Sequence, residues 1–435
     1  MARVLRWFSY LIAFVVLLLA IAYSVAQFYK PRILETINRE VATSVNGSFH
    51  VGGLDFTIFE RFPNFSLTLS DIYLRGPRYD QFAKDVFTAG KIYVHVNPLH
   101  LIRGVLDVNS IAIEEGTIYI FRTKDGYINT DAFKPKDGVQ GKKPDSVKTN
   151  SPLALDLSNI RLKNTRFAFI DSLKAKSFDV TFQNTQVAIS SSDTSRLILL
   201  NGPMYFGGLT FNEAKGGYLS NTQLVAALNL EFRPLHQKLV IHPSSLNFGA
   251  WHVDLTGNFG FAAPGLYDLS IKSDHLLYGE GVKVVTRVLG EKLSRYHFEA
   301  PLKLDVAIVG TLAPGDQPRV DINFTTEKNQ FRMGKIVLDD LAFKGSFSNH
   351  IVDSLPYTDP NSAIRLDTLW GKVKRLPFDA KISLVNLTDP DLHINFRSNV
   401  RLTELNRESD DSKLKFSSGV SRVTFSYDGK LKEYL

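Results

Sequence analysis

The sequence contains no cysteine among its 435 residues. Disulfides, thiolate metal sites and a cysteine nucleophile are therefore excluded. Burial of apolar side chains and pairing of the backbone must hold the fold together. Methionine and tryptophan are also scarce, with 3 residues each, whereas phenylalanine is abundant, with 31. Phe, Val, Ile, Tyr and Thr suit a pleated, half-buried surface, so this composition favours β-structure.

Signatures of enzymes are missing as well. The sequence contains no G-x-S-x-G, H-E-x-x-H, Gly-rich phosphate loop or EF-hand loop. Its histidines are scattered, and His236 and His242, the nearest to a cluster, lie in a Pro-bounded loop without a carboxylate nearby. Asp389–Asp391 is typical of a turn, and turn capping explains Asp71 and Asp171 at strand ends. We predict a protein that is not an enzyme and has no catalytic, metal or cofactor-binding residues.

A concentrated basic stripe, which nucleic-acid binding needs, is also lacking. The net charge is +7 and the pI is about 9.2, but Lys and Arg are spread through alternating segments. We therefore expect no nucleic-acid partner. The charge suits anionic lipid headgroups, and a solvated surface is the alternative.

One long hydrophobic run is present at the N-terminus. Trp7–Tyr29 contains no charged residue, and as a helix it spans about 34 Å, enough for a bilayer core of about 30 Å. Aromatic residues at both ends, with Arg3 and Arg6 before it, predict a single-pass anchor whose N-terminus is cytoplasmic. A cleaved signal peptide is the alternative, because Ser24–Ala26 offers a small-x-small cleavage site.

Two short helices are expected after this run. In the first, Arg32–Val45, apolar residues recur every four positions, which predicts a helix that packs on the first sheet or lies at the membrane surface. In the second, Gly281–Tyr296, apolar residues occur at i, i+3, i+7 and i+11.

From Ser48 to the C-terminus, apolar and polar residues alternate, as in Phe65–Ser70. Such runs of 5–8 residues, separated by turns such as Asp125-Gly126, predict roughly 18–20 antiparallel strands with one apolar and one polar face. A single sheet advances about 4.8 Å per strand, so the strands would form a rod of about 80–90 Å. Filled β-sandwiches would show the same alternation.

Composition divides the chain into four segments. Residues 1–30 form a cytoplasmic stub and the anchor, 31–133 a first β segment with its helix, and 153–435 further β repeats. Between them, Lys134–Pro152 has five Lys, three Pro and no aromatic residue, which predicts a mobile loop. This loop is either a solvated insertion or a contact for phospholipid headgroups.

Several of these segments resemble the AsmA family. Val51–Pro77 is similar to the start of its members, and Phe62-Pro63 and Leu67–Ile72 carry that match. The match continues through three further segments, which are Val94–Ile113, Gly126–Thr130 and Asn159–Asp171. Two departures stand out. Asn164-Thr165 replaces the usual Asn-Gly of the family, and the chain ends at Leu435, where members often continue, so a short or truncated member is expected.

The resemblance implies a single-pass protein of the Gram-negative inner membrane whose bulk is periplasmic. It implies a mainly β fold in which an elongated, curled antiparallel sheet, built from repeats, forms a groove with an apolar floor. It also implies a role in outer-membrane biogenesis, with phospholipid moving along the groove and with envelope proteins as further partners. The candidate groove-lining residues lie on the apolar faces of the predicted strands: Phe65, Leu67, Leu69, Phe167, Phe169, Leu228, Leu230, Val253, Leu255, Phe259, Leu304, Val306, Ile382, Ile394 and Phe396.

Two other functions compete with lipid transfer. A non-enzymatic envelope scaffold would tether an outer-membrane assembly partner through a strand edge. A secreted carbohydrate-binding β-protein would carry clustered Trp and Tyr on loops, whereas Trp7, Trp251 and Trp370 are far apart.

Overall fold

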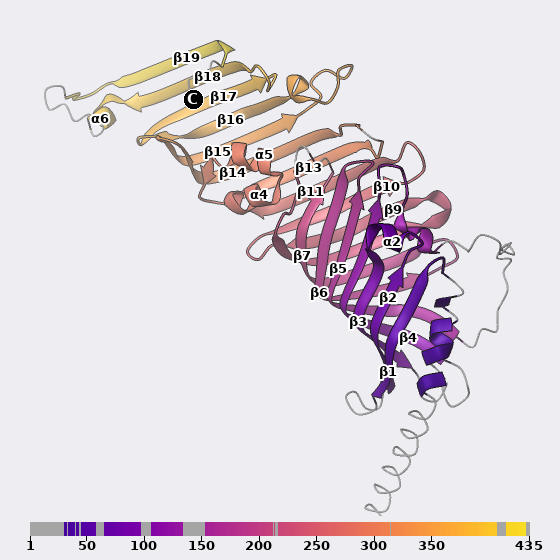
Figure 1. The fold of residues 1–435 in the computed structure, drawn as a ribbon. Coiled ribbons are helices and arrows are strands. Elements are labelled where there is room, and N and C mark those ends of the chain that lie inside the picture. The colour runs from indigo at the N-terminus through magenta and orange to yellow at the C-terminus, as the bar shows by residue number, and fades with distance from the viewer. Residues whose placement is uncertain are drawn as a thin grey trace, which may run out of the picture. The chain divides into compact units, whose positions relative to one another are not determined.

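The structure is a computed structural model of the chain (Figure 1). It describes residues 30–32, 34–39, 41–42, 45–57, 65–96, 106–133, 153–211, 213, 216–313, 315–406 and 415–431. The predicted anchor, Trp7–Tyr29, and the predicted loop, Lys134–Pro152, lie outside these residues. Among the helices that are described, none combines the length and apolar character needed to cross a membrane.

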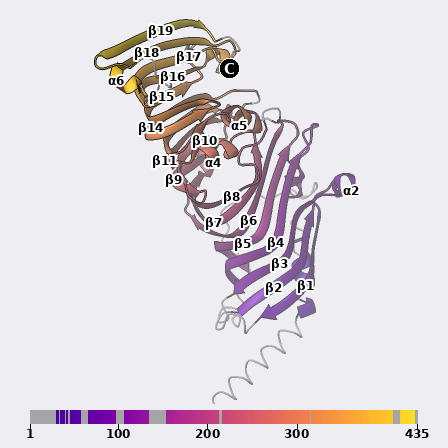
Figure 2. The same ribbon diagram turned by 90° about the vertical axis from the view of Figure 1, so that its left-hand side faces the viewer.

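The chain divides into two compact units. Unit 1 comprises the described residues up to Ser190 together with Asn201–Glu213, and unit 2 comprises Ser191–Leu200 and the described residues from 216 onward. Strand β7 is divided between the two units. Figure 2 shows the strands of each unit arranged as a layer.

Unit 1 begins with the N-terminal helix, whose described residues are 30–32, 34–39 and 41–42. Its further elements are β1 (Ser48–Thr57), β2 (Phe65–Arg75), α2 (Tyr79–Phe82), β3 (Asp85–Val96), β4 (Leu106–Arg122), η1 (Asn129–Phe133), β5 (Leu153–Asp171), β6 (Lys176–Ser191) and part of β7 (Arg196–Thr210).

Unit 2 holds the remaining strands and, among its described residues, five short helical elements. In chain order they are β8 (Thr222–Arg233), η3 (Pro234–His236), β9 (Lys238–Asn247), β10 (His252–Gly260), β11 (Leu266–Leu276), α4 (Tyr278–Val284), α5 (Arg287–Leu293), β12 (His297–Phe298), β13 (Leu302–Thr311), β14 (Arg319–Met333), β15 (Ile336–Ser348), η4 (Asp359–Asn361), β16 (Ala363–Val373), β17 (Leu376–Val385), β18 (Asp391–Arg401), α6 (Leu402–Leu405) and β19 (Val420–Lys430).

The mainly β prediction is confirmed, with nineteen strands among the described residues. Antiparallel pairing of neighbours is also confirmed for most of the sheet, from β1–β2 to β18–β19. One pair contradicts it, because β4 and β5 are parallel. The connection between them runs from residue 123 to residue 152, which is long enough to return the chain to the same end of the sheet.

Strands are longer than the predicted 5–8 residues, and β5 reaches 19. The reason is a row of irregular residues that interrupts the ladder in unit 1 without ending any strand. Paired residues on either side place Gly52, Asp71, Gly90, Glu115 and Asn164 at one level across β1–β5. Asp71, Glu115 and Asn164 are left-handed, with φ of 54°, 54° and 47°.

The glycines of this row make room for the left-handed residues. A Cβ on Gly52 would lie 3.0 Å from Cβ of Asp71, and one on Gly90 would lie 3.0 Å from Oε2 of Glu115. The pairing register is the same on both sides of this row, but the side-chain alternation shifts by one, so that Val51 and Leu54 in β1, and Leu69 and Ile72 in β2, all pack in the cores although they are three residues apart. Asp71 therefore lies within β2 and not at a strand end, which corrects the sequence-based expectation.

The N-terminal helix packs on unit 1, as the first of its two interpretations predicted. Leu34 and Ile37 lie against a core of Val51, Ile72 and Ala89. The side chain of Asn38 also pairs with the backbone of β1, accepting a hydrogen bond from Val51 N at 2.8 Å and donating one to Val51 O at 3.2 Å. The helix thus satisfies backbone groups at the outer edge of the first strand.

The second predicted helix, Gly281–Tyr296, is in fact two short helices, α4 and α5. The chain is extended at Val285, where φ is −85° and ψ is 175°, so the helix cannot continue. Thr286 is buried at this break and its carbonyl accepts a hydrogen bond from Gly290 N. β-Branched residues at the break favour the extended backbone over a helix.

Candidate functional site: an apolar sheet face

Unit 2 carries apolar rows that run across its strands. One row joins neighbours from β10 to β18 by direct pairing: Leu255, Ile271, Val306, Ile322, Phe347, Ile364, Leu384 and Leu392. A second row joins neighbours from β13 to β19: Leu304, Phe324, Gly345, Leu366, Ile382, Ile394 and Tyr427. At about 4.8 Å per strand, the seven steps of the first row cover about 34 Å. We call this surface the apolar face.

The opposite face of the same strands is polar. Next to the first apolar row, pairing joins Asp254, Lys272, Asp305, Asn323, Ser346, Arg365, Ser383, His393 and Asp428. Two of these pairs are in direct contact, with Lys272 Nζ 3.0 Å from Asp305 Oδ2 and His393 Nδ1 2.9 Å from Asp428 Oδ1. The sheet of unit 2 therefore separates an apolar surface from a charged one.

Part of the apolar face is covered. Trp251, Leu276, Leu302 and Leu341 are buried in one cluster, against which Tyr278 and Val284 of α4 pack. From β17 to β19 the face becomes more accessible. Ile382 and Phe396 pack against this cluster but are only half-buried, as is Ile394, and on β19 Phe425 is 50% exposed. A filled sandwich core would bury such side chains almost fully. The apolar face is therefore open toward β19 in the described part of unit 2.

The candidate residues of unit 2 fall on this face or next to it. Val253, Leu304, Ile382 and Phe396 belong to the cluster under α4 or pack against it. Phe259 is half-buried and its ring stacks on Tyr267 with centroids 5.4 Å apart. The remaining candidates all lie within named strands: Leu228 and Leu230 in β8, Leu255 in β10, Val306 in β13 and Ile394 in β18.

The candidates of unit 1 have different surroundings. Leu67 is buried and Leu69 half-buried, and both lie in a core to which the N-terminal helix contributes. Phe167 and Phe169 are half-buried on β5, where the ring of Phe169 stacks on Phe178 with centroids 5.6 Å apart. Phe65 is part of β2, and its side chain lies outside the described set.

The sequence-based prediction did not identify a carboxylate partner for His242, but the structure shows one. His242 Nε2 lies 3.0 Å from Glu231 Oε2, because β8 and β9 are neighbours. Arg233 donates hydrogen bonds of 2.9 Å to both oxygens of Glu231. The Arg233 bonds first, and then His242, lower the pKa of Glu231 to about 2. Arg233 and Glu231 lie two residues apart on one face of β8, whereas only the pairing of β8 with β9 brings His242 to them.

The carboxylates singled out from the sequence have structural roles. Asp171 is buried, accepts hydrogen bonds from the N–H groups of Leu173 and Lys174, and pairs with Arg122, so its capping role is confirmed. Asp389 and Asp391 lie 2.8 Å and 3.0 Å from Nζ of Lys430, which closes the end of β19 on the β17–β18 turn.

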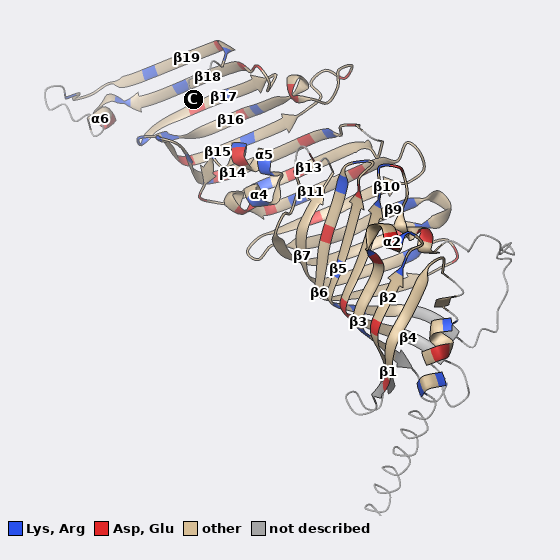
Figure 3. Ribbon diagram, viewed as in Figure 1, with Lys and Arg blue, Asp and Glu red and all other residues tan. Residues whose placement is uncertain are grey.

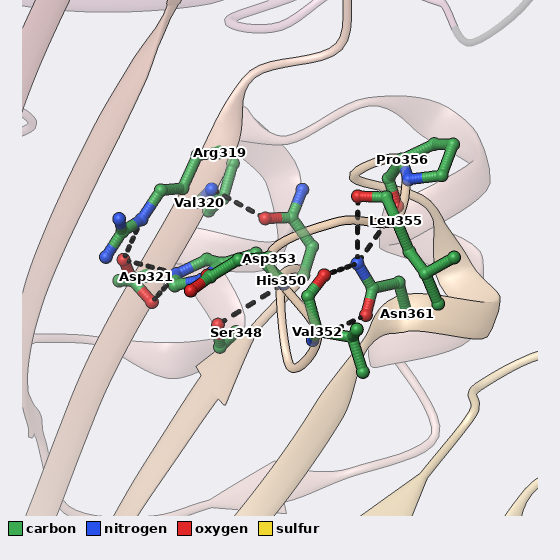
Figure 4. A network of polar contacts seen from close by, with 11 residues as sticks. Arg319, Val320, Asp321, Ser348, His350, Val352, Asp353, Leu355, Pro356 and Asn361 are labelled. Atoms are coloured by element: carbon green, nitrogen blue, oxygen red, sulfur yellow. Dashed lines mark hydrogen bonds and ion pairs between the residues drawn. The ribbon is translucent and has the colours of Figure 1, made fainter.

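A polar network holds the connection between β15 and β16 (Figure 4). Asn361 accepts a hydrogen bond from Val352 N and donates to the carbonyls of Val352, Leu355 and Pro356. Beside it, Nε2 of His350 lies 2.8 Å from Oδ1 of Asp321. Asn361 and His350 thus bond to backbone groups of the connection or to other residues of the network. We infer that the network fixes the shape of this loop.

An apolar face without charged groups can bind hydrocarbon but supplies no general acid, base or nucleophile. Covering exposed CH₂ groups in water is worth about 0.8 kcal/mol each, which favours acyl chains as occupants.

The comparisons with known proteins gave one match. The family model described as AsmA family matches residues 1–239. No curated protein and no solved structure matches the chain.

Proposed function

The chain belongs to the AsmA family, and we propose that it supports outer-membrane biogenesis by conducting phospholipid along its apolar face. In this proposal Trp7–Tyr29 anchors it in the inner membrane, and the bulk of the chain is periplasmic. Phospholipid and the inner membrane are its partners, together with envelope proteins. It acts without catalysis, cofactor or nucleic acid.

The observation that carries the proposal is the continuity of the apolar rows. From Leu255 to Leu392, every strand neighbour adds an apolar side chain to one row. An acyl chain that moves along such a row exchanges one apolar contact for the next and exposes little CH₂ to water, where each would cost about 0.8 kcal/mol. Polar headgroups would remain at the accessible side of the face.

A second function, the envelope scaffold, is favoured by a different observation. β19 pairs with β18, and within the described residues no strand pairs with its other side. Its side chains are mostly exposed, with Val420 at 66% and Val423 at 48%. An edge of this kind can accept a strand from a partner protein.

Lipid bound to the purified full-length protein tests the first function. We expect phospholipid to co-purify, as measured by mass spectrometry after detergent exchange. Ile382→Lys places a charge in the second apolar row and should reduce the bound phospholipid several-fold, because burying that charge beside an acyl chain is costly.

Ser383→Lys is the matched control, since Ser383 follows Ile382 in β17 and lies in the polar row. It should leave the bound phospholipid unchanged. Circular dichroism shows whether both variants fold. Equal lipid content in the folded Ile382→Lys and Ser383→Lys proteins, or no phospholipid in the wild type, would contradict conduction along this face.

A further inference from the structure

Two hairpin turns and a strand end bring cations to one edge of unit 2. β14 and β15 turn at Gly334 and Lys335, β16 and β17 turn at Lys374 and Arg375, and Arg401 ends β18. β15 to β18 are successive neighbours, so at about 4.8 Å per strand their ends span about 14 Å. Figure 3 shows basic residues at the turn between β16 and β17. We call Lys335, Lys374, Arg375 and Arg401 the basic edge.

The cations of the basic edge have no hydrogen-bond or ion-pair partner among the described residues. Two cations inside the adjoining strands are paired. Nζ of Lys372 lies 2.7 Å from Oδ2 of Asp340, and Nε of Arg397 lies 3.3 Å from Oδ2 of Asp379. Lys344, Arg365 and Lys381 also lack such a partner among the described residues, but they lie one to a strand, whereas four cations meet at the basic edge.

The turn between β16 and β17 is poorly suited to its residues. Val373 pairs with Leu376, so Lys374 and Arg375 form a two-residue loop, and their φ values are 47° and 63°. A two-residue loop with both φ values positive favours Asn-Gly. Two long cationic residues occupy a conformation that L residues adopt reluctantly. Turn geometry alone does not explain Lys374 and Arg375, whereas a use for their charges does.

Accessible apolar side chains lie next to the turns of the basic edge or, in the case of Trp370, three residues before the end of β16. Trp370 is 47% exposed, Ile336 43%, Val337 38% and Val373 37%. A Trp with aliphatic neighbours and Lys or Arg beside them is the combination found where proteins enter the headgroup layer of a bilayer.

The other end of the same strands has a different charge. The connection between β15 and β16 carries Asp353, whose side chain is 98% exposed. The connection between β17 and β18 carries Asp389, which with Asp391 binds Lys430. Across β15 to β18, the four cations of the basic edge therefore lie at one end of the strands and these carboxylates at the other, with Glu404 of α6 as an exposed carboxylate beside Arg401.

We propose that the basic edge binds the headgroup surface of an anionic phospholipid bilayer. Lys335, Lys374, Arg375 and Arg401 meet the phosphate groups, and the aliphatic side chains beside them enter the headgroup layer. The inference goes beyond the proposed function, because hydrocarbon can bind the apolar face without the basic edge. The basic edge can likewise bind a membrane even if no phospholipid moves along the apolar face.

Full-length protein held in phosphatidylcholine nanodiscs provides the test. The hydrophobic N-terminal run is inserted in the nanodisc, so it is not free to insert in the added vesicles. Binding of the protein to these vesicles is measured by flotation. We expect the protein to float with vesicles that contain phosphatidylglycerol and to bind pure phosphatidylcholine vesicles much less. Binding should weaken as salt is added, because exposed charges are screened.

The variant Lys374→Asn with Arg375→Gly separates the charge from the turn. It removes two cations and supplies the residues that the turn geometry favours, so the protein should fold with equal or higher thermal stability. Each Lys or Arg near an anionic surface contributes about fivefold to binding, so the dissociation constant should rise about thirtyfold. The matched control removes two cations from exposed strand positions, Lys344→Gln with Lys381→Gln, and should bind nearly as the wild type does.

Three results would overturn the proposal. The wild type could fail to bind vesicles with phosphatidylglycerol, or it could bind both vesicle types equally. The turn variant could also bind as tightly as the control variant. The phospholipid that co-purifies with the turn variant is measured in parallel. We expect the turn variant to co-purify with a normal amount of phospholipid but to lose its binding to vesicles. That pair of results would show that the basic edge and the apolar face act independently.

Discussion

Among individual residues, buried or paired polar groups hold the irregular parts of this fold. Thr165, Asn329 and Asn361 are each at most 2% exposed, and each bonds to backbone carbonyls. Glu231 is held by Arg233, two residues along the same strand, and by His242 on the neighbouring strand. Buried groups of this kind cost about 1–3 kcal/mol when a partner is removed. Their substitution should therefore affect stability more than that of exposed polar residues.

Glu231 gives a prediction about pH. Its folded-state pKa is about 2, below the ordinary value of 4.5. A lowered carboxyl pKa stabilises the folded state fully above the ordinary value, and the effect is lost as the pH falls toward the folded value. Glu231→Gln should therefore lower the urea midpoint of unfolding near neutral pH. The difference from the wild type should shrink between about pH 4.5 and about pH 2.

A matched control for this experiment is Glu327→Gln, since Glu327 is exposed on β14 and no partner is described for it. Its midpoint should follow the wild type at every pH. A Glu231→Gln difference that stays constant down to about pH 2 would show that the Arg233 and His242 contacts do not act through the charge of Glu231.

Among the elements, the irregular row across β1–β5 decides which residues share a face. Val51, Ile72 and Ala89 belong to one core, against which Leu69, Ile92 and Ile113 also pack. Leu69 and Ile72 lie on opposite sides of Asp71 in the same strand and still share that core. The residue of the row in each strand shifts the side-chain alternation by one, so apolar residues on both sides of the row pack in the same core.

Thr165 gives the prediction for this row. Its hydroxyl is buried and donates to the carbonyl of Ile113 at 3.2 Å or of Lys163 at 3.3 Å, where the regular ladder is interrupted. Thr165→Val keeps the shape and removes the donor, so it should lower the free energy of unfolding by about 1–3 kcal/mol. Urea denaturation followed by circular dichroism measures the change.

The comparison for Thr165 is Thr424→Val on β19, where Thr424 is exposed. That variant should unfold within about 0.5 kcal/mol of the wild type, as surface substitutions usually do. If Thr165→Val is equally mild, the buried carbonyl of Ile113 gains nothing from the threonine, and the irregular row does not depend on it.

Alternation was sufficient to predict most strands but not their irregularities. The pattern of Leu67, Leu69 and their polar neighbours follows from the two-residue period of one strand. A strict two-residue period from Leu69 predicts that Asp71 shares its face, whereas the structure places Ile72 there. The shift depends on the left-handed conformation of Asp71, for which Gly52 on the neighbouring strand makes room. The parallel pairing of β4 and β5 was unpredictable for a similar reason, since local sequence contains no information on how a long connection returns.

The candidate site could be predicted in part. The apolar residues of β17 and β18, such as Ile382 and Ile394, follow from alternation, and they do pair. That Leu67 and Leu69 pack with the N-terminal helix, while Phe425 stays exposed, depends on which element covers which strand. The pairing of His242 with Glu231 depends on register. These non-local features are set by the tertiary fold and leave no periodic signal.

At the scale of the whole molecule, we propose different functions for the apolar face and the basic edge. In the two proposals, the apolar face of unit 2 carries hydrocarbon across its strands, and the basic edge binds an anionic bilayer. The residues concerned are separate, so each activity should fail independently. The family assignment rests on the first 239 residues, whereas the basic edge lies beyond them.

Acyl-chain contact on the apolar face is the central claim, and a cross-linking experiment tests it most directly. The chain has no cysteine, so one introduced cysteine can carry a single benzophenone label. Ile394→Cys places the label in the second apolar row, and Asn395→Cys places it on the opposite face of the same strand. Irradiation in the presence of phospholipid, followed by mass spectrometry, should give a phospholipid adduct at position 394 and little at position 395. Equal adducts at the two positions, or none at 394 in the folded protein, would contradict the claim.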